Sequence, residues 1–246
     1  MRFAVLLKWV PDLVEDLEVD DEGTGVDTED LKFKLNEFDD HALEQALLLA
    51  GEGDEVVALT LEGDGAEKML CTAIAKGASR GIRLTGSSSL DTAGLADSFS
   101  QALGADTYDL ILTGVQSVDD RDGQLGPVLA ARMGLPCVSV VSEVGLEGST
   151  AMVAKEYSGG MVAEFEVDLP AVLGIQAASE APRYAPVSRV RQVQQTVDLE
   201  EFAVSGTGAS SGSSITGMAQ PESGGGAKML TGLDELVEVL NGLGVT

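Results

Sequence analysis

The residues best suited to ligand chemistry lie in the stretch from 114 to 127. Gly123 and Gly126 fall between an apolar run at 110–112, typical of a buried strand, and the segment 128–133, which has a helical pattern. Glycines let main-chain amides approach a phosphate, and the next helix offers unpaired N–H groups and a positive dipole end. From these residues alone, a nucleotide-holding loop and a tight turn that binds nothing are equally consistent with the pattern.

The same stretch offers no set of residues for catalysis. It has no Ser/His pair, no cysteine and no histidines at metal-ligand spacing. Its aspartates, at 119, 120 and 122, are interrupted by Arg121 and are interpreted as a solvated, helix-capping run rather than as a metal site. His41, the single histidine of the chain, falls on a predicted amphipathic helix and is interpreted as structural. We predict neither a catalytic residue nor a metal site.

The charge of the chain makes some partners unfavourable. Its 246 residues include 41 acidic and 15 basic side chains, which give a formal net charge of −26. Such a surface repels nucleic-acid phosphates and anionic membranes, so neither is expected as a partner. An acidic excess of this size is also used by halophilic proteins to stay soluble, and we expect a halophile-like surface.

Hydrophobic content and cysteine usage indicate an intracellular protein. The chain is 44% hydrophobic, enough for a sizeable core, and its length fits one large domain with or without an arm. Cys71 and Cys137 are expected to be small buried hydrophobic residues in a reducing cytosol. The apolar run at 3–10 is interrupted by Lys8 and stopped by Pro11, so we predict no signal peptide, no membrane span and a cytoplasmic location.

Strand and helix patterns alternate over the first 141 residues, with an acidic loop or hairpin at 15–30. Asn36 is predicted to cap the first helix, and Gly77 to end the second. The alternation predicts a doubly wound α/β fold, with a mainly parallel sheet and helices on both faces. The predicted strands are 3–7, 55–61, 81–84, 110–113 and 136–141, and the predicted helices are 42–50, 66–76, 91–103 and 128–133.

The pattern changes after residue 141. Two strands, 151–157 and 161–167, flank Ser158-Gly159-Gly160 as a predicted β-hairpin, and another strand is predicted at 170–175. We predict a nucleotide-binding domain over 1–200, a Gly/Ser-rich linker over 205–226 and a C-terminal helical arm over 227–246. The arm's helix is predicted to be capped by Thr231, and its apolar stripe must dock on this domain or on a partner.

Several motifs occur together along nearly the whole chain. They are Lys8-Trp9-Val10-Pro11-Asp12, Asn36-Glu37-Phe38-Asp39, Ala75-Lys76-Gly77-Ala78, the 114–127 loop and the segment 180–185. With these motifs the sequence resembles the β subunit of electron transfer flavoproteins, including the nitrogen-fixation-associated type. The combination of Gln116…Asp119…Gln124-x-Gly126-Pro127 with Pro182-Arg183-Tyr184-Ala185 makes the resemblance specific. It implies a sheet of the adenine-nucleotide α-hydrolase-like type.

The resemblance also implies a function. The chain would be an electron carrier subunit, not an enzyme, that pairs with an α subunit holding most of an FAD. It would carry electrons from acyl-CoA-type or other dehydrogenases to an acceptor of the quinone oxidoreductase type. Its own site would take AMP, or a second FAD in electron-bifurcating members. Carried over by position, the site residues would be Leu6, Asn36, Ala66, Asp119, Gly123, Gln124, Leu125 and Gly126.

The resemblance implies a docking loop as well. The apolar anchor that inserts into partner dehydrogenases aligns with Val187, and Tyr184 could contact the flavin or a partner. The C-terminal helix would reach the α subunit. The sequence departs from the family with Pro186-Val187-Ser188 in place of a leucine before a proline, and at Asp120 and Arg121 from the bifurcating pattern.

Two other functions explain less of the sequence. A homodimeric, stress-type adenine-nucleotide-binding module would account for residues 1–141, but not for the 182–187 loop or the tethered helix. An ATP-splitting enzyme would need a Ser-Gly-Gly-x-Asp-Ser loop after the first strand, whereas Ser158-Gly159-Gly160 lies in the predicted hairpin.

Overall fold

The computed structural model describes residues 1–86, 91–205, 215–221, 226–227 and 229–245. The chain divides into two compact units, one comprising 1–17 with 28–214 and the other 18–27 with 215–246. Much of the predicted 205–226 linker lies outside the described residues. No helix of the described ranges is both long enough and apolar enough to cross a membrane.

A seven-stranded sheet forms the centre of the first unit, with strand order β12-β5-β4-β1-β6-β11-β7. Every neighbouring pair in it is parallel; Val5 on β1, for example, pairs with Ala58 on β4 and Leu112 on β6. Its strands are β1 (Arg2–Leu6), β4 (Glu55–Leu61), β5 (Arg80–Thr85), β6 (Leu110–Gly114), β7 (Cys137–Val141), β11 (Ala171–Ile175) and β12 (Glu200–Ala203). The predicted parallel α/β sheet is confirmed.

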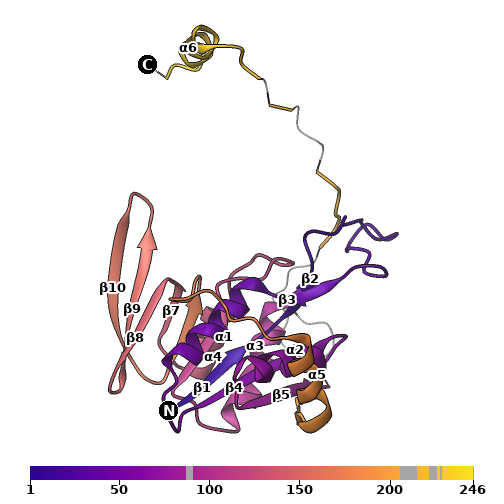
Figure 1. The fold of residues 1–246 in the computed structure, drawn as a ribbon, viewed down its shortest axis with the longest axis vertical. Helices are drawn as coiled ribbons and strands as arrows, with labels where there is room; N and C mark the ends of the chain where they lie inside the picture. Colours follow the sequence, from indigo (N-terminus) through magenta and orange to yellow (C-terminus); the bar gives the residue numbers. More distant parts are fainter. Residues whose placement is uncertain (87–90, 206–214, 222–225, 228, 246) are drawn as a thin grey trace. The chain divides into compact units, whose positions relative to one another are not determined.

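Helices cover both faces of this sheet (Figure 1). The alternation along β1 explains how: Phe3 and Val5 belong to one core cluster, and Ala4 and Leu6 to another. The first cluster includes side chains of α1 (Glu37–Leu49) and α2 (Ala66–Lys76), and the second includes side chains of α3 (Thr92–Gly104) and α4 (Leu125–Met133). Because successive side chains of a buried strand need apolar cover on opposite faces, the fold is doubly wound.

A second, antiparallel sheet has the order β10-β9-β8. The predicted hairpin is confirmed as β9 (Thr150–Tyr157) and β10 (Met161–Asp168), with positive φ at Gly159 and Gly160 in the turn. Ala151, Val153 and Val167 join this sheet to the first core cluster. The third strand, β8 (Glu143–Glu147), was not predicted, because it begins and ends on exposed glutamates.

Two more elements follow β11 that the sequence pattern did not predict. Helix α5 (Val187–Thr196) packs on α2 through Val190, which contacts the cluster of Cys71 and Ala75. Strand β12 then pairs with the edge strand β5. Both elements are mostly exposed, so their sequences lack a long apolar signal.

The remaining elements are short, and two predictions about individual residues need correction. Strands β2 (Trp9–Pro11) and β3 (Phe33–Leu35) form a small antiparallel pair before α1. Cys71 is buried as predicted, but Cys137 is only half-buried. In the second unit, helix α6 (Leu233–Gly242) has Gly232 and not Thr231 at its N-cap, since the Thr231 hydroxyl instead hydrogen-bonds Glu235. No side chain of α6 is buried.

Candidate functional site

A cavity of about 270 Å³ opens at the carboxyl ends of β1, β4 and β6. Open parallel sheets bind ligands at this edge, where strands end and helices begin. The wall is made by residues that follow each strand and by the starts of α2, α3 and α4. Its apolar side chains are Leu6, Leu7, Trp9, Phe33, Leu61, Ala66, Met69, Leu95, Phe99, Val115 and Leu125.

The β6–α4 loop forms one rim of the cavity and is shaped by its own aspartates. The main-chain amides of Asp120, Asp122 and Gln124 donate in turn to the carboxylates of Asp119 (3.1 Å), Asp120 (3.2 Å) and Asp122 (3.1 Å). The three aspartates are exposed, as expected for a solvated run. Gly123 has φ +64, a conformation that glycine adopts without strain. The loop therefore presents main chain at the start of α4.

Four of the eight residues predicted for the site line the cavity, namely Leu6, Ala66, Gly123 and Leu125. The other four do not. Asp119 and Gln124 are exposed on the loop. Gly126 is buried where an added Cβ would lie 3.1 Å from the Thr113 hydroxyl oxygen. This set of eight thus divides into four residues of the wall, two exposed loop residues and two buried residues that do not line the cavity.

Asn36 is the fourth of the predicted residues that do not line the cavity. It occupies the N-cap position of α1 as predicted, but its side chain makes no capping hydrogen bond. The amide Nδ2 instead donates to the main-chain oxygen of Gln116 at 2.9 Å. Since Asn36 is fully buried, this bond fixes the β6–α4 loop to the start of α1.

Asp39, on the first turn of α1, is a buried carboxylate in the cavity wall. One oxygen accepts the main-chain N–H of Lys8 (2.9 Å) and the other accepts that of Gly114 (3.0 Å). Burial raises the pKa of Asp39 to about 7, against the opposing effect of these hydrogen bonds. The carboxylate thus joins the ends of β1 and β6 to α1, and no sequence motif for catalysis indicated it.

Lys8 is the one basic residue among the described residues that line the cavity. Its ammonium group donates to the hydroxyl of Ser117 (3.0 Å) and to the carboxylates of Asp119 (2.9 Å) and Asp120 (2.8 Å). Burial favours the neutral amine, but these carboxylates outweigh it and raise the pKa of Lys8. Among the described residues, no group of three or more His, Cys, Asp or Glu side chains is arranged to hold a metal ion.

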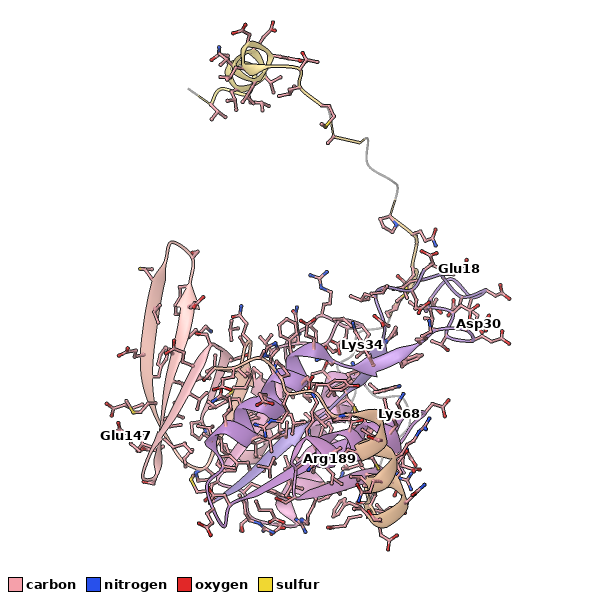
Figure 2. The ribbon with its side chains drawn as sticks, viewed as in Figure 1. Glu18, Asp30, Lys34, Lys68, Glu147 and Arg189 are labelled. Atoms are coloured by element: carbon pink, nitrogen blue, oxygen red, sulfur yellow. The ribbon has the colours of Figure 1, made fainter. Side chains whose placement is uncertain are left out.

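Trp9 packs closely against the turn that begins α2. An added Cβ on Gly65 would lie 2.6 Å from Cε2 of the indole, so this position requires glycine, which also has φ +86. The ammonium of Lys68, labelled in Figure 2, lies 5.8 Å from the Trp9 ring centroid. Trp9 belongs to a sequence motif, but its place in the wall depends on a contact with a turn 56 residues away.

The predicted docking residues lie away from the cavity lining. Tyr184 is 80% exposed and Val187, which begins α5, is 59% exposed. The chain before them is attached to α1 by Glu44, a carboxylate that accepts the main-chain N–H of Arg183 (2.9 Å) and its guanidinium (2.7 to 3.0 Å). Burial opposes ionisation of Glu44, but Arg183 outweighs it and lowers the pKa of Glu44.

Two more side chains of α1 hold residues 178–187, which include Tyr184 and Val187 and are called the docking segment below. His41 accepts the main-chain N–H of Ala178 at 3.1 Å, and Gln45 accepts that of Ser179 at 2.9 Å. His41 therefore has the structural role that was predicted for it. Helix α1 contacts the cavity at its first turn and the docking segment along its length.

Comparisons of the sequence with known proteins point to one family. Residues 24–205 match the family model described as "Electron transfer flavoprotein domain". The electron transfer flavoprotein β subunit of Methylophilus methylotrophus is 30% identical, over 85% of this chain and 82% of that protein. The mitochondrial electron transfer flavoprotein β subunit of Arabidopsis thaliana is 29% identical, over 98% of this chain and 97% of that protein. The electron transfer flavoprotein β subunit of Clostridium acetobutylicum is 31% identical, over 77% of this chain and 74% of that protein. The Arabidopsis alignment spans almost the whole chain, including both the cavity and the docking segment.

Proposed function

The chain belongs to the electron transfer flavoprotein family, and we propose that it is the β subunit of a heterodimer that carries electrons through an FAD shared with an α subunit. The observation that carries the proposal is the cavity at the carboxyl edge of β1, β4 and β6, in a chain similar to β subunits along most of its length. A flavin bound by the heterodimer would supply the acceptance and release of electrons. This chain's residues would bind, orient and shield it.

The cavity is proposed to hold AMP rather than a second FAD. Its volume of about 270 Å³ lies near the lower limit of small-molecule sites, roughly 300 to 1,000 Å³, which favours the smaller ligand. Apolar side chains such as Leu6, Ala66 and Leu125 suit an adenine base. Main chain at Gly123 and at the start of α4 suits a phosphate, because no Cβ blocks Gly123 and the helix end is positive.

The terminal helix α6 is proposed to pack on the α subunit. Its apolar residues remain exposed, with Leu233 at 78%, Val237 at 48% and Leu236 at 41%. A helix of ten residues is marginal in water by itself. Covering this apolar stripe with a partner subunit would stabilise the helix, which supports a role as the contact arm of the heterodimer.

The docking segment is proposed to bind redox partners in the cytoplasm. Tyr184 and Val187 are large, exposed and close in the chain, and Glu44 and Arg183 fix their base to α1. Exposed tyrosines are enriched among the residues that are buried on association, and Val187 adds an exposed apolar side chain three residues along the chain. The expected partners are acyl-CoA-type or other dehydrogenases as donors and a quinone oxidoreductase as acceptor.

Isolation of the complex tests the proposed assembly. The chain is co-expressed with the α subunit of the same source, and nucleotides are extracted from the purified complex and counted. We expect a yellow heterodimer with one FAD and one AMP. Two FAD per heterodimer would overturn the assignment of AMP. A colourless homodimer that binds adenylates would instead favour a stress-type nucleotide-binding module.

A fluorescence titration tests the cavity itself. The chain contains a single tryptophan, Trp9, which lines the cavity, so its emission reports on ligand there. AMP added to nucleotide-free heterodimer is expected to change the tryptophan emission saturably, and the part of the change that is lost in Trp9→Phe is due to this chain. The variant Gly123→Val should weaken the response, because a β-branched residue at φ +64 is strained. Gly104→Ala is the control, since an added Cβ there meets no atom within 4 Å.

A further inference from the structure

The charges around the cavity are unfavourable for an anion. Among its described lining residues, five carry carboxyl groups and only Lys8 carries a basic group. A phosphate monoester brings further negative charge into this wall, and like charges at short range repel. The carboxyl-bearing residues are Asp39, Glu62, Asp64, Asp120 and Asp122. Lys8 is therefore the side chain of the wall that can attract a phosphate.

The ammonium group of Lys8 already has an acceptor for each of its hydrogen-bond donors. A lysine ammonium group has three N–H donors. Here they meet three acceptors, on Ser117 at 3.0 Å, Asp119 at 2.9 Å and Asp120 at 2.8 Å. A phosphate oxygen can therefore bind this ammonium at full strength only by replacing one of the three.

Asp120 is the acceptor best placed to be replaced. It lines the cavity together with Lys8, whereas Asp119 does not. Its other oxygen accepts the main-chain N–H of Asp122, so the carboxylate keeps a partner without Lys8. Its ion pair is also partly solvated, with side-chain exposure of 31% for Lys8 and 36% for Asp120, so separating the two charges is not prohibitive.

We propose that Lys8 is the phosphate-binding cation of the cavity, and that a nucleotide phosphate takes the place of the Asp120 carboxylate on its ammonium group. The inference rests on the proposed function and assigns the group that recognises the ligand's phosphate. Asp120 acts as an internal competitor of the phosphate. Lysine serves as a phosphate-binding point charge in other nucleotide sites for the same electrostatic reason.

The test compares AMP with adenosine, which lacks the phosphate. Dissociation constants are measured by calorimetry on nucleotide-free heterodimer, for the wild type and for Lys8→Gln. Loss of a charged hydrogen bond should weaken AMP binding by roughly ten- to a hundredfold. Adenosine binding should change less than about twofold, which shows that the cavity is intact, and Lys8→Arg should restore part of the AMP affinity.

The second variant, Asp120→Asn, is expected to change AMP affinity in the opposite direction. Removing the competing carboxylate should tighten AMP binding by about two- to fivefold and leave adenosine unchanged. Arg121→Gln is the matched control, because it removes a charge from the same loop outside the cavity lining and should change neither constant.

Each outcome of these titrations decides the inference. AMP binding that is unchanged in Lys8→Gln, or that weakens in Asp120→Asn, would overturn it while leaving the nucleotide site in place. A loss of adenosine binding that equals the loss of AMP binding in Lys8→Gln would also overturn it, as a structural effect. A wild-type heterodimer that binds neither ligand would overturn the proposed nucleotide site and this inference with it.

Discussion

Helix α1 carries two buried carboxylates, one in the cavity wall and one under the docking segment, and their surroundings differ. Asp39, at the cavity, is 7% exposed and accepts two main-chain N–H groups, from Lys8 and Gly114. Glu44, five residues on, is 3% exposed and is paired with the guanidinium of Arg183. Burial therefore dominates at Asp39 and raises its pKa to about 7, whereas Arg183 outweighs burial at Glu44 and lowers its pKa.

The difference shows how one helix holds two regions of the chain by different means. At the docking segment, the charge of Glu44 is neutralised by a partner from the chain itself, which gives a fixed base for Tyr184. At the cavity, the charge of Asp39 is only partly compensated, and the wall keeps an electrostatic cost that a closed ion pair would have removed. Groups held at such a cost occur preferentially where ligands bind.

The largest expected effect comes from crowding the cavity carboxylate. In Gly114→Ala, the new Cβ would lie 2.7 Å from Cβ of Phe38 and 2.8 Å from the main-chain nitrogen of Asp39. Because main chain cannot move aside cheaply, we expect a loss of at least about 3 kcal/mol in the free energy of unfolding, measured by urea denaturation.

Gly104→Ala, at the end of α3, is the control for that substitution. Its added Cβ meets no atom within 4 Å, so its stability should be unchanged or slightly raised. A loss in Gly114→Ala no greater than in Gly104→Ala would mean that α1 is not held tightly against β6.

The next effect separates the two carboxylates by pH. Asp39 binds a proton more tightly in the folded chain, at about 7 against 3.8, so its contribution to stability is present below pH 3.8 and is lost as pH rises through 7. The variant Asp39→Asn has no ionisable group at this position, so it does not lose stability in this way as pH rises. Its stability relative to the wild type should therefore improve by about 2 to 3 kcal/mol between pH 5 and pH 8.

Glu44 should behave in the opposite way. Its folded pKa is lowered, so its contribution is present above the unfolded value of 4.5 and is lost only as pH falls below that value. Between pH 5 and pH 8, the stability of Glu44→Gln relative to the wild type should stay constant. Parallel pH profiles for the two variants would contradict the assigned difference between the carboxylates.

A smaller effect is expected from breaking the ion pair under the docking segment. Glu44→Gln leaves Arg183 without its carboxylate, but Arg183 is 42% exposed and water compensates in part. We expect a loss of about 1 to 2 kcal/mol in the free energy of unfolding. The exposed Glu52, just beyond α1, provides the control Glu52→Gln, which removes the same charge and should have no measurable effect.

Much of the first unit could be predicted because its elements are apolar and bounded by glycine. Helix α2 has the predicted bounds 66–76, since its periodic apolar face ends at Gly77. β8, α5 and β12 were missed for a shared reason. They are mostly exposed and are held by tertiary contacts, such as Val190 against Cys71 and Arg83 against Glu201, which leave no local pattern.

The candidate site also has a part that could be predicted from local sequence and a part that depends on tertiary contacts. The β6–α4 loop was found because its glycines are close in the sequence and follow a strand. The aromatic side chains of the cavity, Trp9, Phe33 and Phe99, come from three separate elements, and only the folded sheet edge brings them to one cavity. Asn36 was placed correctly at the start of α1, but its bond to Gln116 spans 80 residues and has no sequence signature.

The smallest effect on stability is expected at the tip of the docking segment. Tyr184 is 80% exposed, so Tyr184→Ala should change the free energy of unfolding by less than about 0.5 kcal/mol, and AMP affinity should not change. If the segment binds redox partners, the same variant should raise the KM of the heterodimer for its dehydrogenase at nearly constant kcat, measured by steady-state electron transfer.

A variant that weakened AMP binding as well would contradict the separation of the two regions, because Tyr184 does not line the cavity and Glu44 holds the segment's base in place. The contrast between the two carboxylates of α1 thus predicts two surfaces that can be altered one at a time.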